Sequence, residues 1–188
     1  MPARAHRTAV AYPGARRQRR SHVDAVSAQP APSPLRWRGW SLLAWIAACH
    51  VAGALGALAT DATLYRALIR PSWAPPGWLF GPVWTALYTA MGIAAWSLWR
   101  APAGPARRAA LTAFVAQLAL NASWTPIFFG LRAIGAALVV IVALLAAIAV
   151  TIARAWPVSR PAAALLAPYL AWVAFATALN AALWQLNR

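Results

Sequence analysis

Five apolar segments of about 20 residues each make up most of the sequence after residue 39. They span approximately residues 40–60, 78–99, 109–129, 133–155 and 162–184. A helix needs about 20 predominantly apolar residues to cross the roughly 30 Å hydrocarbon core of a bilayer. The strands of a membrane barrel would instead be alternating segments of about ten residues, which this sequence does not contain. The sequence therefore predicts an all-α integral membrane protein with a five-transmembrane-helix bundle over residues 39–188.

The charged residues favour a membrane protein over a nucleic-acid-binding protein. Only 10% of the 188 residues are charged, whereas a soluble domain has about 25%. All 17 basic residues are arginines, and the acidic residues are Asp24 and Asp61. After residue 38 the arginines lie in or beside the gaps between apolar segments, and do not cluster as on a soluble nucleic-acid-binding fold. We therefore expect membrane lipids, and no nucleic acid, among the partners.

Residues 1–38 form a basic, Pro-rich tail without apolar periodicity, which is typical of a disordered segment. Its run RRQRR, at 16–20, retains this end of the chain on the inner side, rests on anionic lipid headgroups, or forms a nuclear-type or nucleic-acid-binding patch. An arginine-rich, acid-poor tail is also typical of organelle presequences. Under the positive-inside rule, the arginine distribution predicts that the N-terminus is inside and Arg188 outside.

Polar and aromatic residues recur at helical spacing within three of the five segments. The three sets are Trp84 and Tyr88; Gln117, Asn121 and Trp124; and Tyr169, Trp172, Ala176 and Asn180. Spacings of three or four residues place the members of each set on one helical face. Because an unpaired polar group costs several kcal/mol in hydrocarbon, the three faces are predicted to meet inside the bundle. There they either hydrogen-bond the helices to one another or form the wall of a ligand pocket.

The tryptophans divide into two groups by their place in the segments. Those near segment ends suit anchoring at the membrane surface: Trp37, Trp40, Trp99, Trp156 and Trp184. Trp84 and Trp172 lie well inside their segments, where an indole offers a flat apolar face and one N–H donor. These two residues favour a pocket for a flat, apolar ligand with a polar edge.

The sequence offers little for conventional catalysis or metal binding. Cys49 is the sole cysteine, and His50 has no second histidine or carboxylate within an apolar segment to complete a metal site. No apolar segment contains Asp or Glu, which argues against proton-coupled or cation-coupled transport. Small residues recur at every fourth position and allow close packing either within the bundle or between protomers. They are Ala48, Ala52, Gly56 and Thr60 in the first segment, and Ala143, Ala147 and Thr151 in the fourth.

Three stretches together resemble the TspO/MBR family, the tryptophan-rich sensory protein or translocator protein family, also called the peripheral-type benzodiazepine receptor. They are RPSWAPPGWLFGPVWTALYTAMG (70–92), QLALNASWTPIFFG (117–130) and APYLAWVAFATALN (167–180). The resemblance covers about residues 40–187 and implies a five-helix bundle, usually dimeric, whose pocket opens toward the long first loop. Members bind porphyrins such as protoporphyrin IX, and some bacterial members are associated with light- and oxygen-dependent porphyrin breakdown.

The resemblance also assigns roles to residues of this chain. It places at the ligand pocket the loop residues Trp73 and Trp78 and the helix residues Trp84, Asn121, Trp124, Trp172 and Ala176. It implicates Trp84 and Trp172 in porphyrin chemistry, and Tyr88, one turn from Trp84, is expected on the same pocket face. Animal members also bind cholesterol, but Ala181 and Gln185 stand where their recognition segment has Tyr and a basic residue, so cholesterol binding by that segment is not expected.

The resemblance implies a membrane protein that binds a tetrapyrrole, protoporphyrin IX or haem, as a sensor or scavenger in porphyrin and stress regulation. The alternatives are a porphyrin-degrading enzyme with Trp84 and Trp172 as catalytic residues, and a porphyrin or lipid transporter. The porphyrin propionates would reach Arg66 and Arg70. No metal or obligatory cofactor is expected, and the protein is expected to be a homodimer. Its location would be the bacterial cell membrane, or the mitochondrial outer membrane of a eukaryote.

Overall fold

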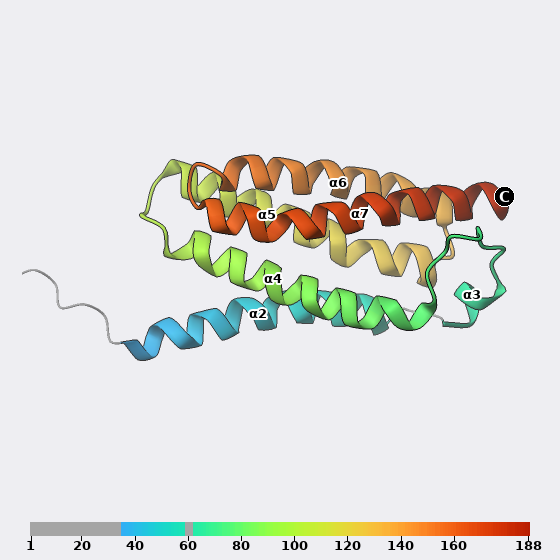
Figure 1. The fold of residues 1–188 in the computed structure, drawn as a ribbon, viewed down its shortest axis with the longest axis horizontal. Helices are drawn as coiled ribbons and strands as arrows, with labels where there is room; N and C mark the ends of the chain where they lie inside the picture. The colour runs from blue at the N-terminus through green and yellow to red at the C-terminus, as the bar shows by residue number, and fades with distance from the viewer. Residues whose placement is uncertain (1–34, 59–61) are drawn as a thin grey trace, which may run out of the picture. The chain divides into compact units, whose positions relative to one another are not determined.

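The described part of the chain is a bundle of five long helices lying side by side (Figure 1). The computed structural model describes residues 35–58 and 62–188. The long helices are α2 (Leu35–Leu58), α4 (Phe80–Arg100), α5 (Pro105–Thr125), α6 (Ile134–Ala155) and α7 (Arg160–Leu186). The short elements are α3 (Ala62–Ala67), the 3-10 turn η1 (Gly77–Leu79) and the π-helical turn η2 (Pro126–Gly130). The predicted all-α, five-helix architecture is confirmed for these residues, none of which forms a strand.

The first connector and the tail differ from the sequence-based expectation in detail. The basic tail predicted for residues 1–38 lies, up to residue 34, outside the described residues, and α2 already begins at Leu35. The connector before α4 contains the short helix α3 (Ala62–Ala67). We call residues 62–79, which include α3 and η1, the cap segment, because it lies at the end of the bundle where α4 begins and α7 ends (Figure 1).

A regular spacing of buried residues explains why α5, α6 and α7 pack together. In α6 the buried positions are separated alternately by four and three residues: Ala137, Ile141, Leu144, Ile148, Thr151 and Ala155. The same spacing recurs in α5, and in α7 among Ala162, Leu166, Tyr169 and Val173. An average repeat of 3.5 residues keeps one helical face directed at its neighbours along the whole length. Accordingly α6 packs against both α5 and α7, and α4 packs against α7.

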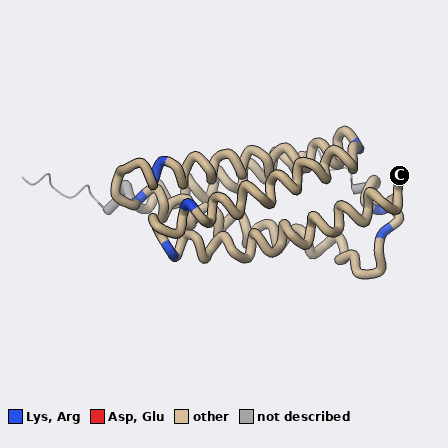
Figure 2. Tube along the Cα trace, turned by 90° about the horizontal axis from the view of Figure 1, so that it is seen from above, with Lys and Arg blue, Asp and Glu red and all other residues tan. Residues whose placement is uncertain are grey.

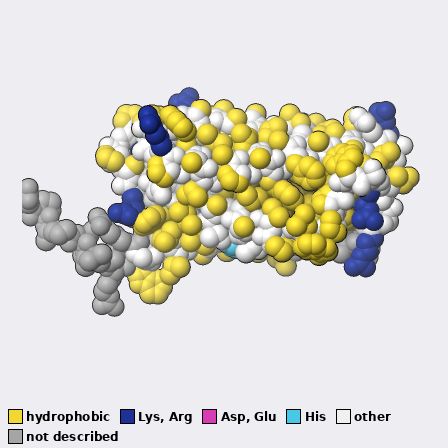
Figure 3. Space-filling model, in the orientation of Figure 1, with side chains coloured by type: hydrophobic (Ala, Val, Ile, Leu, Met, Phe, Trp, Pro, Cys, Tyr) yellow, Lys and Arg dark blue, Asp and Glu magenta, His cyan; other side chains and the backbone are white. Residues whose placement is uncertain are grey.

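The outer surface of the bundle is apolar along its length. Figure 3 shows hydrophobic side chains over the lateral face and arginines near the two ends. By length and composition, the helical stretches 39–58, 134–155 and 160–186 of α2, α6 and α7 are able to cross a membrane. Helices α4 and α5 have 21 residues each, long enough to cross, and α5 carries the buried polar residues Gln117 and Asn121.

Two exposed threonines of α4 show how polar side chains are accommodated on the lipid-facing surface. The Thr85 hydroxyl donates a hydrogen bond to the Gly81 carbonyl at 2.9 Å, and the Thr89 hydroxyl donates to the Thr85 carbonyl at 2.8 Å. Both hydroxyls are therefore paired within their own helix. This pairing removes the main cost of placing them against hydrocarbon.

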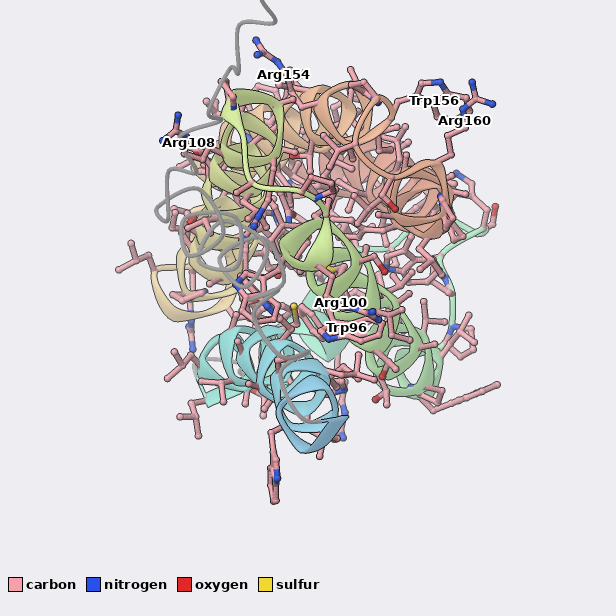
Figure 4. The ribbon with its side chains drawn as sticks, turned by 90° about the vertical axis from the view of Figure 1, so that its left-hand side faces the viewer. Trp96, Arg100, Arg108, Arg154, Trp156 and Arg160 are labelled. Atoms are coloured by element: carbon pink, nitrogen blue, oxygen red, sulfur yellow. The ribbon has the colours of Figure 1, made fainter. Side chains whose placement is uncertain are left out.

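Arginines of the described residues lie only at the two ends of the bundle (Figure 2). At one end the Arg100 guanidinium lies 4.6 Å from the Trp96 ring centroid, and Arg160 lies 5.6 Å from that of Trp156. Figure 4 views this end and shows Arg108, Arg154 and Arg160 projecting outward. Tryptophan and arginine at helix ends are typical of the membrane–water interface.

The α5–α6 connection is organised by a proline and an unusual backbone turn. Proline disfavours continuation of an α-helix, and the α-helical part ends at Thr125, directly before Pro126. Residues Pro126–Gly130 continue as a wider π turn, in which the Leu131 N–H donates to the Pro126 carbonyl at 2.9 Å. In this connection Arg132 has left-handed backbone geometry, with φ of 53°.

Helix α2 approaches the other helices at glycines. A Cβ on Gly53 would overlap the Tyr88 ring of α4, and one on Gly56 would lie 3.1 Å from the Thr125 side chain of α5. Gly92 of α4 lies against the backbone of Ile46. In the first small-residue stripe, Gly56 therefore packs inside the bundle, Ala48 is exposed, and Thr60 lies outside the described residues. Small residues at these positions let the helix backbones approach closely, and the resulting van der Waals contacts stabilise helix association in lipid.

We predict that Gly92→Ala separates α2 from α4 and lowers stability by about 1–3 kcal/mol. The added Cβ would lie 2.5 Å from the Ile46 Cα and 2.8 Å from its backbone nitrogen, so no side-chain adjustment can relieve the overlap. The measurement is the thermal unfolding midpoint of the detergent-solubilised protein. Gly81→Ala is the matched control on the same helix, because a Cβ there has no neighbour within 4 Å. Equal midpoints for the two variants would contradict this packing.

Candidate functional site

A cavity of about 770 Å³ lies among the five long helices and is bordered at one end by the cap segment. Its lining is largely aromatic and aliphatic, with a few amide, hydroxyl and guanidinium groups. From α2 and the cap segment come Gly53, Ala57, Tyr65, Arg66, Arg70, Gly77 and Trp78. From α4, α5 and η2 come Phe80, Gly81, Trp84, Tyr88, Asn121, Trp124, Thr125, Phe128 and Phe129. From α6 and α7 come Ile141, Leu144, Trp172, Val173, Ala176, Leu179, Asn180 and Leu183.

All the predicted ligand-binding residues except Trp73 line this one cavity. They are Trp78, Trp84, Tyr88, Asn121, Trp124, Trp172 and Ala176. Trp73 instead packs edge-to-face against Phe175, with ring centroids 5.8 Å apart, and its side chain is about half exposed. It holds the cap segment against α7 and does not line the cavity.

Aromatic contacts hold the side chains of Trp84 and Trp172 in place. Trp84 stacks on Tyr88, with centroids 5.2 Å apart and planes inclined by 27°. The Trp172 ring contacts the rings of Phe80 and Phe175, with centroid distances of 6.0 Å and 5.5 Å respectively. Because offset and edge-to-face ring contacts are favourable, the neighbouring rings hold both indoles in defined orientations in the cavity wall.

A chain of four hydrogen-bonded side chains lies beside the cavity and joins three helices. The Tyr88 hydroxyl donates to Asn121 Oδ1 at 2.7 Å, and Asn121 Nδ2 donates to the Tyr169 hydroxyl at 3.0 Å. The Tyr169 hydroxyl donates in turn to Gln117 Oε1 at 3.0 Å. Asn121 therefore both hydrogen-bonds helices to one another and lines the cavity. Both roles considered from the sequence, helix contact and pocket wall, apply to this amide. Gln117 connects helices only.

A second polar link joins α5, α6 and α7 nearer the cap segment. The Trp124 indole N–H donates to Asn180 Oδ1 at 3.1 Å, and Asn180 Nδ2 donates to the Ile134 carbonyl at 3.0 Å. Asn180, from the polar face predicted for segment 162–184, is thus hydrogen-bonded to Trp124, from the polar face predicted for segment 109–129. Since no water competes inside a bilayer, such bonds select one rotation of each helix.

Three of the four residues of the first hydrogen-bonded chain have a tryptophan one helical turn away. The pairs are Tyr88 with Trp84, Asn121 with Trp124, and Tyr169 with Trp172. Helix α4 starts at the cap end, whereas α5 and α7 end there, so all three tryptophans lie on the cap side of the hydrogen bonds. The site is therefore layered, with a polar network first, then indoles, and then the cap segment.

Two buried N–H groups beside the cavity have no hydrogen-bond partner in the described structure. They are the Nε2 amide of Gln117 and the Nε1 indole of Trp172. An unpaired buried donor costs about 1–3 kcal/mol, and such groups are rare in native proteins. Trp172 is itself part of the cavity wall, so its indole is a spare donor there.

The cap end of the cavity is cationic. Arg66 and Arg70 line the cavity and are exposed, and the Arg70 guanidinium lies 5.3 Å from the Tyr65 ring centroid. Neither Asp nor Glu occurs among the described residues. The two guanidinium groups are therefore available to anionic groups from outside the described protein.

The site contains no residue set for metal chemistry within the described ranges. No three His, Cys, Asp or Glu side chains there come together. His50 Nδ1 is 3.0 Å from the Ile46 carbonyl, a bond within its own helix, and Cys49 is a buried free thiol. The cavity can act chemically through aromatic stacking, hydrogen bonding and charge.

The sequence of the chain matches one group of proteins. Residues 45–185 match the family model described as the TspO/MBR family. The chain belongs to the TspO/MBR family. The resemblance seen in the sequence is thereby confirmed, and the protein is a member of a family of membrane proteins.

Relatives of this TspO/MBR chain include animal and bacterial proteins. It is 46% identical over 125 residues to the translocator protein of Homo sapiens, covering 65% of this chain and 74% of that protein. It is 37% identical over 149 residues to the tryptophan-rich sensory protein of Cereibacter sphaeroides, covering 79% of this chain and 92% of that protein. Protein CrtK of Rhodobacter capsulatus is 37% identical to the chain over 144 residues, covering 76% of this chain and 90% of that protein.

Several residues of the site were missed by reasoning from the sequence. Gly53 and Ala57 of α2 line the cavity but are small and apolar, so no polar periodicity marked them. Tyr65 lies in a connector, where periodicity is absent. Phe128 and Phe129 follow Pro126 in the π turn, whose geometry shifts their direction relative to an α-helical continuation.

We predict that Tyr169→Phe lowers the free energy of unfolding by about 1–3 kcal/mol, because it leaves Asn121 Nδ2 and Gln117 Oε1 without their shared partner. Chemical or thermal unfolding in one detergent measures this. Thr85→Val is the control, since it removes an exposed hydroxyl bonded only to its own helix. A Tyr169→Phe protein as stable as the control would show that the network contributes nothing to the bundle.

Proposed function

We propose that the cavity binds a tetrapyrrole of the protoporphyrin IX class and that the protein acts as a membrane sensor or scavenger of it. The observation that carries this proposal is the combination of indole walls, Trp84 and Trp172, with a cationic end formed by Arg66 and Arg70. A porphyrin has the complementary parts, a large flat apolar ring and two anionic propionates. Porphyrin binding by other members of the family, implied by the sequence resemblance, points the same way.

The dimensions and chemistry of the cavity support a ligand of this kind. About 770 Å³ falls within the range of roughly 300–1,000 Å³ typical of sites for small molecules and cofactors. Tryptophan faces favour offset stacking on a flat ring. The propionates would lie at Arg66 and Arg70, near the membrane surface, where charge-assisted hydrogen bonds orient the ring edge.

A sensory or transport role is supported by the names of relatives, which include a tryptophan-rich sensory protein and a translocator protein. In a sensor, occupancy of the cavity would be the signal. The homodimer expected from the family would carry one such cavity in each protomer.

Light-driven breakdown of the bound porphyrin is a second candidate function. The observation in its favour is that Trp84 and Trp172 both belong to the cavity wall, so a bound ring would contact at least one indole. A photoexcited porphyrin can exchange an electron with an indole, with oxygen as the oxidant of the overall reaction.

We predict that Trp84→Phe combined with Trp172→Phe weakens protoporphyrin IX binding roughly tenfold, because two large stacking surfaces are reduced. Titration followed by porphyrin absorbance measures the affinity. Illumination of the complex in air then separates the two candidate functions. A new product spectrum that the double variant lacks supports the enzyme, and reversible quenching alone supports the sensor. Trp99→Phe, at the exposed membrane surface, is the control. Unchanged affinity and unchanged photochemistry in the double variant would exclude both roles of these residues.

We predict that Arg66→Gln combined with Arg70→Gln weakens protoporphyrin IX binding roughly tenfold and leaves binding of its dimethyl ester unchanged. The ester has no carboxylates for the guanidinium groups to bind. The pair Arg154→Gln and Arg160→Gln removes the same charge at the other end of the bundle and serves as the control. Equal losses for acid and ester would show that the arginines shape the cavity without binding the propionates.

A further inference from the structure

Asn187, next to the end of the chain, joins the cap segment to α7 through both ends of its carboxamide. The Ile69 N–H donates to Asn187 Oδ1 at 2.9 Å, and Asn187 Nδ2 donates to the Ile69 carbonyl at 2.9 Å. The two residues are 118 positions apart in sequence. The Asn187 carboxamide thus pairs with both the N–H and the carbonyl of Ile69, as the backbone of a neighbouring β-strand residue does in an antiparallel sheet.

The Asn187 side chain is itself held in place by its own helix. Its Nδ2 also donates to the Leu183 carbonyl at 2.8 Å, four residues earlier. Leu183 is buried and lines the cavity. The carboxamide therefore connects the last turn of α7, which forms part of the cavity wall, to the backbone of the cap segment.

The cap segment covers the end of the cavity. Tyr65, Leu68 and Ala74 pack on the apolar cluster that contains Phe128 and Leu179. Arg66, Arg70 and Trp78 of the same segment line the cavity. A ligand that fills the cavity from this end must displace residues whose backbone is fixed near its midpoint at Ile69.

The cap segment also contacts α7 through an aromatic pair. Trp73 packs on Phe175, whereas the Tyr65 hydroxyl donates at 3.4 Å to the Pro75 carbonyl within the cap segment itself. Ring contacts tolerate sliding, but a reciprocal pair of hydrogen bonds has one geometry. The Asn187 bonds therefore define the position of Ile69 against the end of α7 more narrowly than the ring contact does.

We propose that Asn187 is a latch, a positioning residue that holds the cap segment over the cavity and controls how fast ligand enters and leaves. The proposal rests on the cavity being the ligand site proposed above. Since the latch is present with or without ligand, breaking it speeds opening in both states. Association and dissociation rates then rise together, and the dissociation constant changes little.

The amide is required because it offers one acceptor and one donor in a plane. Asn187→Asp keeps the size and the acceptor but places a second oxygen against the Ile69 carbonyl, so it breaks the latch without changing packing. Asn187→Leu removes both bonds. Gln185→Ala, an exposed position on the same final turn, is the matched control.

The test uses the full chain in lipid nanodiscs with protoporphyrin IX as probe, followed by stopped-flow quenching of tryptophan fluorescence. We expect both rate constants to rise roughly tenfold in Asn187→Asp and Asn187→Leu, with the dissociation constant within about threefold of the wild type and with Gln185→Ala unchanged. Unchanged rates, or a rise in dissociation alone, would overturn the latch. So would slower association with a lowered unfolding midpoint, which indicates a merely structural role.

A measurement without ligand separates the latch from the proposed function. Hydrogen–deuterium exchange of the ligand-free protein reports opening of the cap segment directly. We expect peptides covering residues 62–79 to exchange faster in both Asn187 variants, with peptides from α5 and α6 unchanged. If wild-type protein does not bind protoporphyrin IX, the proposed function fails, and the exchange result alone decides the latch. Equal exchange in wild type and variants excludes it.

Discussion

In the interior of a bilayer no water is available to satisfy a polar side chain, and the arrangement of this bundle depends on how Asn121 meets that condition. Its carboxamide accepts a hydrogen bond from Tyr88 and donates one to Tyr169. The bonds fix the rotation of α4, α5 and α7 about their axes. The tryptophans one turn toward the cap segment are consequently directed at one shared space, which is the cavity.

The cavity changes character along the bundle axis. Its inner part has the hydrogen-bonded amides and hydroxyls, its middle has indoles, and its cap end has the guanidinium groups of Arg66 and Arg70. An amphipathic ligand with a flat body and anionic groups at one edge has one favourable orientation in such a gradient. The same placement explains why α5 is less apolar than α6, since its buried polar residues Gln117 and Asn121 face the interior and do not contact lipid.

The polar side of the site was predictable from the sequence, and its small-residue side was not. Spacings such as Trp84–Tyr88 and Gln117–Asn121 identify inward faces because the bilayer penalises the alternative. Gly53 and Ala57 complete the cavity from α2, yet nothing distinguishes them from other small residues in an alanine-rich helix. Trp73 was expected at the pocket and lies on Phe175 instead, because the conformation of a connector follows from tertiary contacts and not from periodicity.

The central claim is that a tetrapyrrole occupies this cavity with its ring against the indoles and its carboxylates at the cap end. The most direct measurement is an experimental structure of the purified protein in lipid with protoporphyrin IX bound. The account predicts ring density in contact with Trp84 or Trp172, and propionate oxygens within hydrogen-bonding distance of Arg66 or Arg70. Porphyrin bound only on the lipid-facing surface of the helices, with none in the cavity, would contradict it.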